Sequence, residues 1–317
     1  MTTSDLIKTY LAARRAHGVR LDTAQRVLYQ FASETGDRPL AEVTPEAVAT
    51  FLRGRALSAT WTTRYALLAS FYRYAIARGH VAMSALPEQR PKLPPPQTPY
   101  VYSRDELRRL LDATTVLKSP FSSLQALTYR TLLLLLYGTG LRVSEAIGLT
   151  LGDVDVPGRV LTIRDTKFYK SRLVPIGQQL TATLVTYIEQ RSALPMTLGD
   201  RSAFLSTRCG HHLHYDRVNL LFQRVRAGAR IVCPPGEPRP PRLHDLRHTA
   251  AVHRVVAWYQ DGKNVQKLLP HLATYLGHVS IASTQRYLQM TPELLHEASL
   301  RFETYARIDV EPEVNHA

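Results

Sequence analysis

The chain has 317 residues, which is enough for two domains that each bury a core of their own. Its formal net charge is +14, and seven lysines leave 33 arginines among its 40 basic residues. A planar guanidinium matches phosphate oxygens better than an ammonium does, so the composition indicates a polyanionic partner. The alternative is an arginine-rich proteome in which the charge has no functional meaning.

Other features exclude several classes of protein. Two cysteines cannot form a disulfide scaffold and fit a reducing compartment. The longest apolar run, Leu132–Leu136, is far shorter than the roughly 20 residues of a membrane span. The N-terminal segment has no basic stretch followed by an apolar one, so we expect no secretory signal. The sequence therefore predicts a cytoplasmic protein without a membrane partner.

Residues 1–85 are predicted to form a small all-helical domain. Ser4 and Asp5 are suited to cap a first helix, and Thr44 followed by Pro45 is a strong helix start. A longer helix is expected over 58–77. Five arginines lie on or beside the last two helices, and they either contact a nucleic-acid backbone or simply form a solvated face: Arg53, Arg55, Arg64, Arg73 and Arg78.

Residues 86–100 are predicted to be a linker. The segment Pro87–Pro99 holds so many prolines that it can neither continue a helix nor join a sheet. An extended, semi-rigid connector therefore separates the first domain from a second domain over residues 101–317.

The second domain is predicted to contain a buried central helix over Leu124–Tyr137, which is apolar nearly all round. Gly140 ends this helix, and a new helix is expected to begin around Arg142. The free N–H groups at that helix start, together with the Arg142 guanidinium, are suited to bind an anion. Glu145 lies one turn further on and can orient the guanidinium. The alternative is an ordinary surface pair of an arginine and a glutamate.

A β-hairpin is predicted from Val160–Ile163 and Leu173–Ile176, joined by a basic turn that contains Lys167 and Lys170. A basic turn is often only solvated charge. Further helices are expected over 181–191 and 215–229, and a short extended segment over 204–205. The second of these helices carries Arg217 and Arg224, which we interpret as contacts to a DNA backbone.

Five residues raise the question of a zinc site. Their spacing does not match the paired cysteines or histidines that usually close such a site, so we expect no metal. These residues are Cys209, His211, His212, His214 and Cys233.

The segment 242–287 carries the chemistry. His244 and Arg247 are three apart and share one face of a helix. Gly277 is suited to cap a helix and is followed by His278, and Tyr287 comes nine residues later. Guanidiniums and imidazoles bind phosphate oxygens, and a tyrosine can form a covalent phosphate ester. This set can hold and attack a phosphodiester without a metal.

From about Val101 to its C-terminus, the chain resembles the tyrosine recombinases of the phage integrase family. The resemblance rests on 138–150 around Arg142, on the hairpin with Lys167, and on the segment that carries His244, Arg247, His278 and Tyr287. It implies a mainly α fold with a small β-hairpin, in which an N-terminal all-α core-binding domain precedes an α+β catalytic domain of the integrase type.

The resemblance also implies roles for these residues. Tyr287 would be the nucleophile, Lys167 the general acid, and Glu145 a support for Arg142. Lys170 and Arg172, at the end of the turn, would contact DNA. Tyr275 and Tyr305 are the competing tyrosines, but neither has the family spacing. No cofactor is implied.

The implied function is site-specific recombination of double-stranded DNA through a 3′-phosphotyrosyl intermediate, as in the integration of a mobile element. The implied assembly is a homotetramer on DNA, alone or together with a related recombinase. A helix expected from Pro292 onward packs either on its own subunit or on a neighbour. A type IB topoisomerase and a non-catalytic DNA-binding factor are the alternatives.

Overall fold

The computed structural model describes most of the chain as two units, Met1–Thr98 and Pro99–Ala317. Each unit has its own hydrophobic core and is described separately. The described part of the chain is predominantly helical, with one small sheet, which confirms the predicted fold class. The described residues are 1–16, 21–54, 59–92, 99–164, 171–196, 199–237, 239–278, 284 and 299–300.

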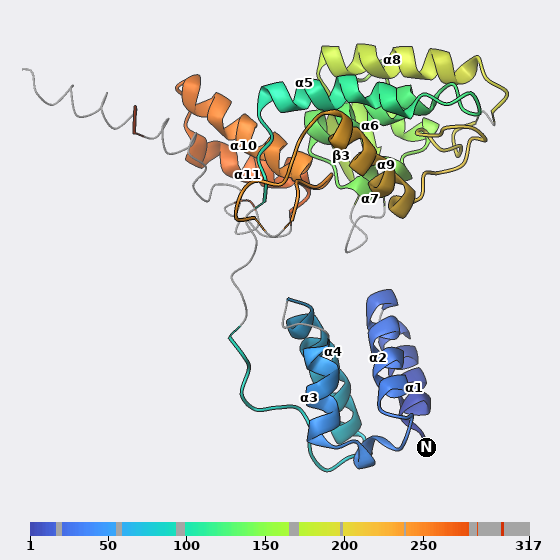
Figure 1. The fold of residues 1–317 in the computed structure, drawn as a ribbon, viewed down its shortest axis with the longest axis vertical. Helices are drawn as coiled ribbons and strands as arrows, with labels where there is room; N and C mark the ends of the chain where they lie inside the picture. Colours follow the sequence, from blue (N-terminus) through green and yellow to red (C-terminus); the bar gives the residue numbers. More distant parts are fainter. Residues whose placement is uncertain are drawn as a thin grey trace, which may run out of the picture. The chain divides into compact units, whose positions relative to one another are not determined.

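The first unit is a helical bundle built on one apolar core (Figure 1). Aromatic rings meet edge to face inside it, as Phe31 and Phe51 do with ring centroids 5.2 Å apart. A 3₁₀ turn, η1 (Leu40–Glu42), precedes the third helix. The helices are α1 (Thr3–Ala16), α2 (Asp22–Glu34), α3 (Pro45–Arg53) and α4 (Ala59–Ala77).

The starts of α1 and α3 test the predicted caps. The Thr44 hydroxyl accepts the N–H of Ala47 at 3.3 Å, so α3 begins as predicted. Helix α1 begins earlier than predicted, because Ser4 already lies in its first turn and donates its N–H to Asp37 at 2.7 Å. The hydroxyl of Thr2 accepts the N–H of Asp5 at 3.2 Å and takes the place of the predicted cap.

The second unit is larger and is arranged around helix α6 (Gln125–Thr139). This helix contacts α5, α7, α8 and α10, and Figure 1 shows α10 and α11 side by side at one end of the unit. Most leucines of α6 are buried, as its nearly all-round apolar sequence predicted, whereas Leu127 and Leu134 are half-buried. The other helices are α5 (Arg104–Ala113), α7 (Val143–Gly148), α8 (Gln178–Ser192), α9 (Tyr215–Gly228), α10 (Asp245–Gln260) and α11 (Val265–Leu276), with 3₁₀ turns η2 (Thr114–Leu117) and η3 (Leu151–Asp153).

A three-stranded antiparallel sheet lies between α7 and α8 in the sequence. Its strands are β1 (Val154–Asp155), β2 (Val160–Ile163) and β3 (Arg172–Pro175), in the order β1-β2-β3. Strand β3 begins one residue earlier than predicted, because Arg172 pairs with Ile163 at the end of the hairpin.

The extended segment predicted over 204–205 forms no strand. Phe204 and Leu205 are fully buried, and the neighbouring Ala203 makes a single bridge with Thr150. Hydrophobicity in this segment therefore reflects a buried loop and not a sheet.

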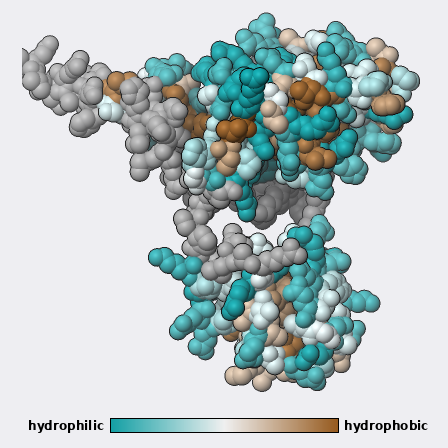
Figure 2. Space-filling view, viewed as in Figure 1, coloured by the Kyte–Doolittle hydropathy of each residue, from teal (hydrophilic) through white to brown (hydrophobic). Residues whose placement is uncertain are grey.

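The visible face of both units is largely hydrophilic, with scattered apolar residues (Figure 2). Within the described ranges, no helix has both the length and the apolar character that crossing a membrane requires.

The central position of α6 makes a testable prediction for stability. Replacing the fully buried Leu132 with alanine should lower the free energy of unfolding of the second unit by about 2–5 kcal/mol, because a cavity replaces packed methyl groups. Urea denaturation followed by Trp258 fluorescence in a Trp61→Phe background reports on this unit alone. Leu220→Ala on α9, at a half-exposed position, is the matched control and should change the value by less than about 0.5 kcal/mol.

Candidate active site

The first part of the site is the junction between α6 and α7. Gly140 ends α6 in the left-handed conformation, and a Cβ there would come within 2.5 Å of the Leu276 side chain. Arg142 then caps α7. The carboxylate of Glu145 accepts the Arg142 N–H at 3.0 Å and its Nη1 at 2.7 Å. The Arg142 N–H predicted to be free for an anion is therefore already bound, whereas the predicted pairing of Glu145 with the guanidinium is present.

Glu145 also binds a second arginine, from the sheet. Arg172 donates from Nη1 and Nη2 to the two carboxylate oxygens at 3.1 and 2.8 Å. The Glu145 side chain is only 6% exposed. Burial by itself would raise the pKa of Glu145, but the hydrogen bonds from Arg172 and Arg142 outweigh this effect and lower the pKa to about 2.

The C-terminal end of α11 gathers three guanidiniums. Three consecutive carbonyl groups, of Tyr275, Leu276 and Gly277, accept hydrogen bonds in turn from Arg172 (3.2 Å), Arg247 (2.7 Å) and Arg142 (3.1 Å). The last carbonyls of a helix have no partner within the helix, and the helix dipole makes this end attractive to cations. We call these three groups the α11 carbonyl end. It brings together arginines from three separate segments.

Arg247 is held more tightly than Arg142. It is buried in the first turn of α10, and its Nη1 donates to the carbonyl of Gly140 at 2.6 Å. The Arg142 side chain, by contrast, is 30% exposed. Both arginines therefore reach the same helix end, and Arg142 is the more accessible of the two.

His278 follows the α11 carbonyl end directly. Its Nε2 lies 2.8 Å from Nη2 of Arg247. Because an arginine can only donate, Nε2 accepts and the ring proton is on Nδ1, which lies 2.8 Å from the hydroxyl of Thr284. Burial and the positive charges of Arg247 and Arg142 lower the pKa of His278 to about 4, so the ring is neutral at neutral pH.

His244 is held at the start of α10 by its neighbours. Asp245 is buried and accepts the N–H and Nη2 of Arg242 at 2.7 and 2.8 Å. Tyr102 donates its hydroxyl to the Arg242 carbonyl at 2.9 Å. Partial burial and the charge of Arg247 lower the pKa of His244, although the residue keeps contact with solvent.

Four predicted site residues lie outside the described residues: Arg55, Lys167, Lys170 and Tyr287. Of the competing tyrosines, Tyr305 also lies outside them. Tyr275 is described, and it donates its hydroxyl to the carbonyl of Pro175 at 3.2 Å. Its burial raises the pKa of this phenol.

The arginines predicted to contact DNA differ in their surroundings. Arg53, Arg73, Arg217 and Arg224 are exposed, whereas Arg55 lies outside the described residues. Arg64 already has a local contact, because its guanidinium lies 4.6 Å from the centroid of the Phe51 ring and donates to the Phe51 carbonyl at 2.5 Å.

Arg172 also differs from a surface cation. Its side chain is 13% exposed, and it is bound to Glu145 and Tyr275. Sequence reasoning took this residue for part of the basic turn and missed its pairing with Glu145. The one feature of the sequence that could have indicated this pairing is the place of Arg172 directly before the apolar residues of the second hairpin strand.

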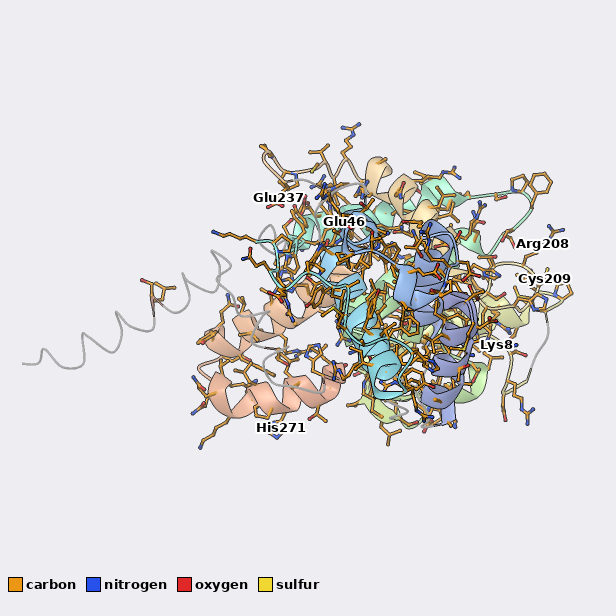
Figure 3. The ribbon with its side chains drawn as sticks, turned by 90° about the horizontal axis from the view of Figure 1, so that it is seen from below. Lys8, Glu46, Arg208, Cys209, Glu237 and His271 are labelled. Atoms are coloured by element: carbon orange, nitrogen blue, oxygen red, sulfur yellow. The ribbon has the colours of Figure 1, made fainter. Side chains whose placement is uncertain are left out.

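The cysteines and histidines considered for zinc do not converge. Cys209 and Cys233 are exposed, and His212 directs Nδ1 to the carbonyl of Ile147 at 3.0 Å. Figure 3 shows Cys209 beside Arg208, at the opposite end of this unit from His271. Within the part of the chain that the structure describes, no group of three or more His, Cys, Asp and Glu side chains is arranged to hold a metal ion.

The depressed pKa of Glu145 makes a prediction for stability at low pH. The unfolded chain takes up this proton near pH 4.5 and the folded chain only near pH 2, so stability present above pH 4.5 is lost as the pH falls towards 2. The contribution is on the order of 3 kcal/mol. Glu145→Gln should therefore show a flatter dependence of unfolding free energy on pH in this window, measured by urea denaturation. An unchanged slope would contradict this assignment.

Comparisons with known proteins show the family to which the chain belongs. The sequence profile of the phage integrase family matches residues 101–293. A protein of Sinorhizobium fredii (strain NBRC 101917 / NGR234) named integrase/recombinase y4rB is 35% identical over 308 residues, which cover 94% of this chain and 96% of that protein. The tyrosine recombinase XerD of Mycobacterium leprae (strain TN) is 32% identical over 87% of this chain and 88% of its own.

Solved structures share the fold. A lambda integrase dimer bound to a COC′ core site has a TM-score of 0.65 at 19% identity and covers 90% of this chain and 77% of that chain. The Tn1549 transposon integrase in complex with a circular intermediate DNA has a TM-score of 0.66 at 19% identity, over 90% and 95% of the two chains. Together with the family profile and the relatives above, these similarities confirm the resemblance, and the chain belongs to the phage integrase family of tyrosine recombinases.

Proposed function

We propose that this DNA breaking-rejoining enzyme acts through Tyr287, with Arg142, Arg247, His244 and His278 holding the phosphate that is attacked. One observation supports this set above all others. Arg142 and Arg247 come from distant segments, yet they donate to adjacent carbonyls of the α11 carbonyl end, immediately before His278. Two guanidiniums fixed side by side offer a phosphodiester the charge that its transition state requires.

The chemistry follows from these groups. The Tyr287 hydroxyl attacks the scissile phosphorus, a bond forms from the phenolic oxygen, and the bond to the 5′-oxygen of the next nucleotide breaks. Lys167 gives a proton to the departing 5′-oxygen, and the 3′-phosphate stays on the tyrosine. Attack by a 5′-hydroxyl reverses these steps and rejoins a strand, so the phosphotyrosine conserves the bond and no nucleotide is consumed.

The histidines contribute hydrogen bonds in their neutral forms. With a pKa of about 4, His278 carries no charge at neutral pH, and His244 has its pKa lowered as well. Neutral His244 can donate one proton to a phosphate oxygen or accept one from the attacking phenol. His278 accepts from Arg247 through Nε2 and contacts Thr284 through Nδ1, so it donates to a phosphate oxygen by exchanging the Thr284 contact. The permanent positive charge of the site then comes from Arg142 and Arg247.

Double-stranded DNA is the partner that the charge supports. The net charge is +14, and exposed arginines lie on both units. The solved relatives include a lambda integrase tetramer bound to a Holliday junction. By analogy, we propose that this chain acts as a homotetramer on DNA, alone or with a related recombinase. In this proposal, residues 1–85 bind the core of the DNA site, residues 86–100 link the domains, and residues 101–317 form the catalytic domain. Recombination of a mobile element fits the relatives named as integrases.

The nucleophile is tested by removing one oxygen atom. Tyr287→Phe should abolish the covalent adduct with a nicked duplex that carries the DNA flanking this gene, because no phenolic oxygen remains to attack. The measurement is a denaturing gel of protein incubated with end-labelled duplex. DNA affinity should stay within about two-fold, since neither arginine is changed.

Tyr275→Phe is the matched control, because it removes a phenol that already donates to the Pro175 carbonyl. This variant should still form the adduct. Adducts that persist in Tyr287→Phe would refute the nucleophile. Relaxation of supercoiled DNA by dilute monomer without joining of two duplexes would favour a type IB topoisomerase, and absence of any adduct in the wild-type protein would favour an accessory factor.

The exposed arginines of α9 make a prediction for DNA binding. Replacing Arg217 or Arg224 with glutamine should weaken binding to any duplex to a similar degree. It should also reduce the slope of log affinity against log salt by about 1, because one phosphate contact is lost. Fluorescence anisotropy at several salt concentrations gives both quantities. Arg108→Gln on α5 changes the same charge at an exposed position and should keep the wild-type slope.

A further inference from the structure

All three nitrogens of the Arg172 guanidinium donate to groups within the protein. Nε donates to the Tyr275 carbonyl at 3.2 Å, and Nη1 and Nη2 donate to the two oxygens of Glu145 at 3.1 and 2.8 Å. Such a bidentate pair with a carboxylate fixes the orientation of the guanidinium plane as well as its position. The side chain is also only 13% exposed. These contacts leave it poorly disposed to reach a DNA phosphate.

The backbone at Gly277 is shaped around this guanidinium. A Cβ at this position would lie 2.7 Å from Nη1 and 2.8 Å from Cζ of Arg172, closer than real Cβ contacts come. Gly277 also has a φ of +69°, a conformation that side chains with a Cβ rarely adopt. The backbone conformation favours glycine here, and the absence of a Cβ leaves room for the Arg172 guanidinium against the peptide that precedes His278.

The contacts close into a ring. Arg172 holds Glu145, Glu145 holds Arg142 through both its side chain and its N–H, and Arg142 returns to the carbonyl of Gly277 at 3.1 Å. The backbone then leads from Gly277 back to Tyr275, which Arg172 binds. Strand β3, the start of α7 and the end of α11 are therefore joined by one carboxylate and two guanidiniums.

We propose that Arg172 is a positioning residue of the recombination site, which fixes Arg142 and the peptide before His278 and ties them to the strand that follows the Lys167 turn. This inference rests on the function proposed above, and it replaces the DNA contact that the sequence predicted for Arg172. The residue acts through Glu145 and through the α11 carbonyl end and does not touch the substrate.

Lysine cannot perform this task. Its single ammonium group cannot span both oxygens of Glu145 and also reach the Tyr275 carbonyl in one plane. A charge would remain, but the orientation of Glu145 and therefore of Arg142 would be lost. Displacement of a substrate-holding group by about 1 Å can cost on the order of 10²-fold in rate. Charge alone therefore should not restore the function of this position.

The test separates binding from chemistry. Single-turnover cleavage of a nicked duplex carrying the DNA that flanks this gene gives the rate, and anisotropy on the same duplex gives the Kd. For Arg172→Lys and Arg172→Gln we expect a cleavage rate lower by about 10²-fold, with the Kd changed by less than about three-fold. Gly277→Ala should reproduce this split, because it displaces the guanidinium without removing it.

Arg164→Gln is the matched control. Arg164 lies just after β2, on the same hairpin, but its side chain is largely exposed and pairs with Asp153. The variant loses the same charge and should cleave at nearly the wild-type rate. Thermal melting establishes that each variant is folded before its rate is compared. If Arg172→Gln does not fold, the charge-conserving lysine variant and Gly277→Ala decide the question.

Several outcomes would overturn the inference alone. Wild-type cleavage by Arg172→Lys would do so, as would a Kd that weakens in step with the rate together with a salt slope reduced by about 1, which marks a phosphate contact. A lowered melting temperature with an unchanged rate would make Arg172 merely structural. If the wild-type protein itself forms no adduct, the proposed function fails instead, so the two failures are distinguishable.

Discussion

Three guanidiniums bind to three consecutive carbonyls at the C-terminal end of one helix, and close contacts between distant segments of the second unit make this possible. Arg142, Arg172 and Arg247 repel one another, and the Glu145 carboxylate, which pairs with Arg142 and Arg172, offsets part of this repulsion. The remaining compensation comes from the α11 carbonyl end, where carbonyl groups without helical partners and the negative end of the helix dipole coincide. The result is a site with a fixed excess of positive charge.

The arginines of this arrangement are held in fixed orientations before a substrate binds. Charges that are already oriented do not need to reorganise when a phosphate gains charge in the transition state. The depressed pKa of Glu145 keeps its carboxylate ionised, and the depressed pKa of His278 keeps its imidazole from adding another buried charge. Of the two arginines proposed to hold phosphate, Arg142 is the more exposed and Arg247 is buried. A phosphodiester therefore reaches Arg142 without displacing Arg247.

Two glycines allow segments that are distant in the sequence to approach one another closely. Gly140 permits α6 to end against Leu276, and the carbonyl of the same glycine receives Arg247. Gly277 permits α11 to end against Arg172. The backbone conformation favours each glycine, and the absence of a Cβ leaves room for the neighbouring side chain. The family match covers both the segment around Arg142 and the segment that carries Arg247. The contacts explain how these two segments meet.

The sequence by itself determined the helices, the hairpin and the family. All-round apolar character identified α6, and a threonine followed by proline identified the start of α3, because these signals depend on nearby residues alone. The spacing of Arg142 and Glu145, one helical turn apart, also predicted their pairing correctly.

Only the tertiary structure decided how the arginines are used. In the sequence, Arg172 looks like any basic residue beside a turn and Arg64 like any basic residue of a helix, yet each is bound to groups of its own unit. Which carbonyl or carboxylate a guanidinium reaches depends on segments far away in the chain. No local pattern encodes that distance, so the ring that joins β3, α7 and α11 emerges only when the chain has folded.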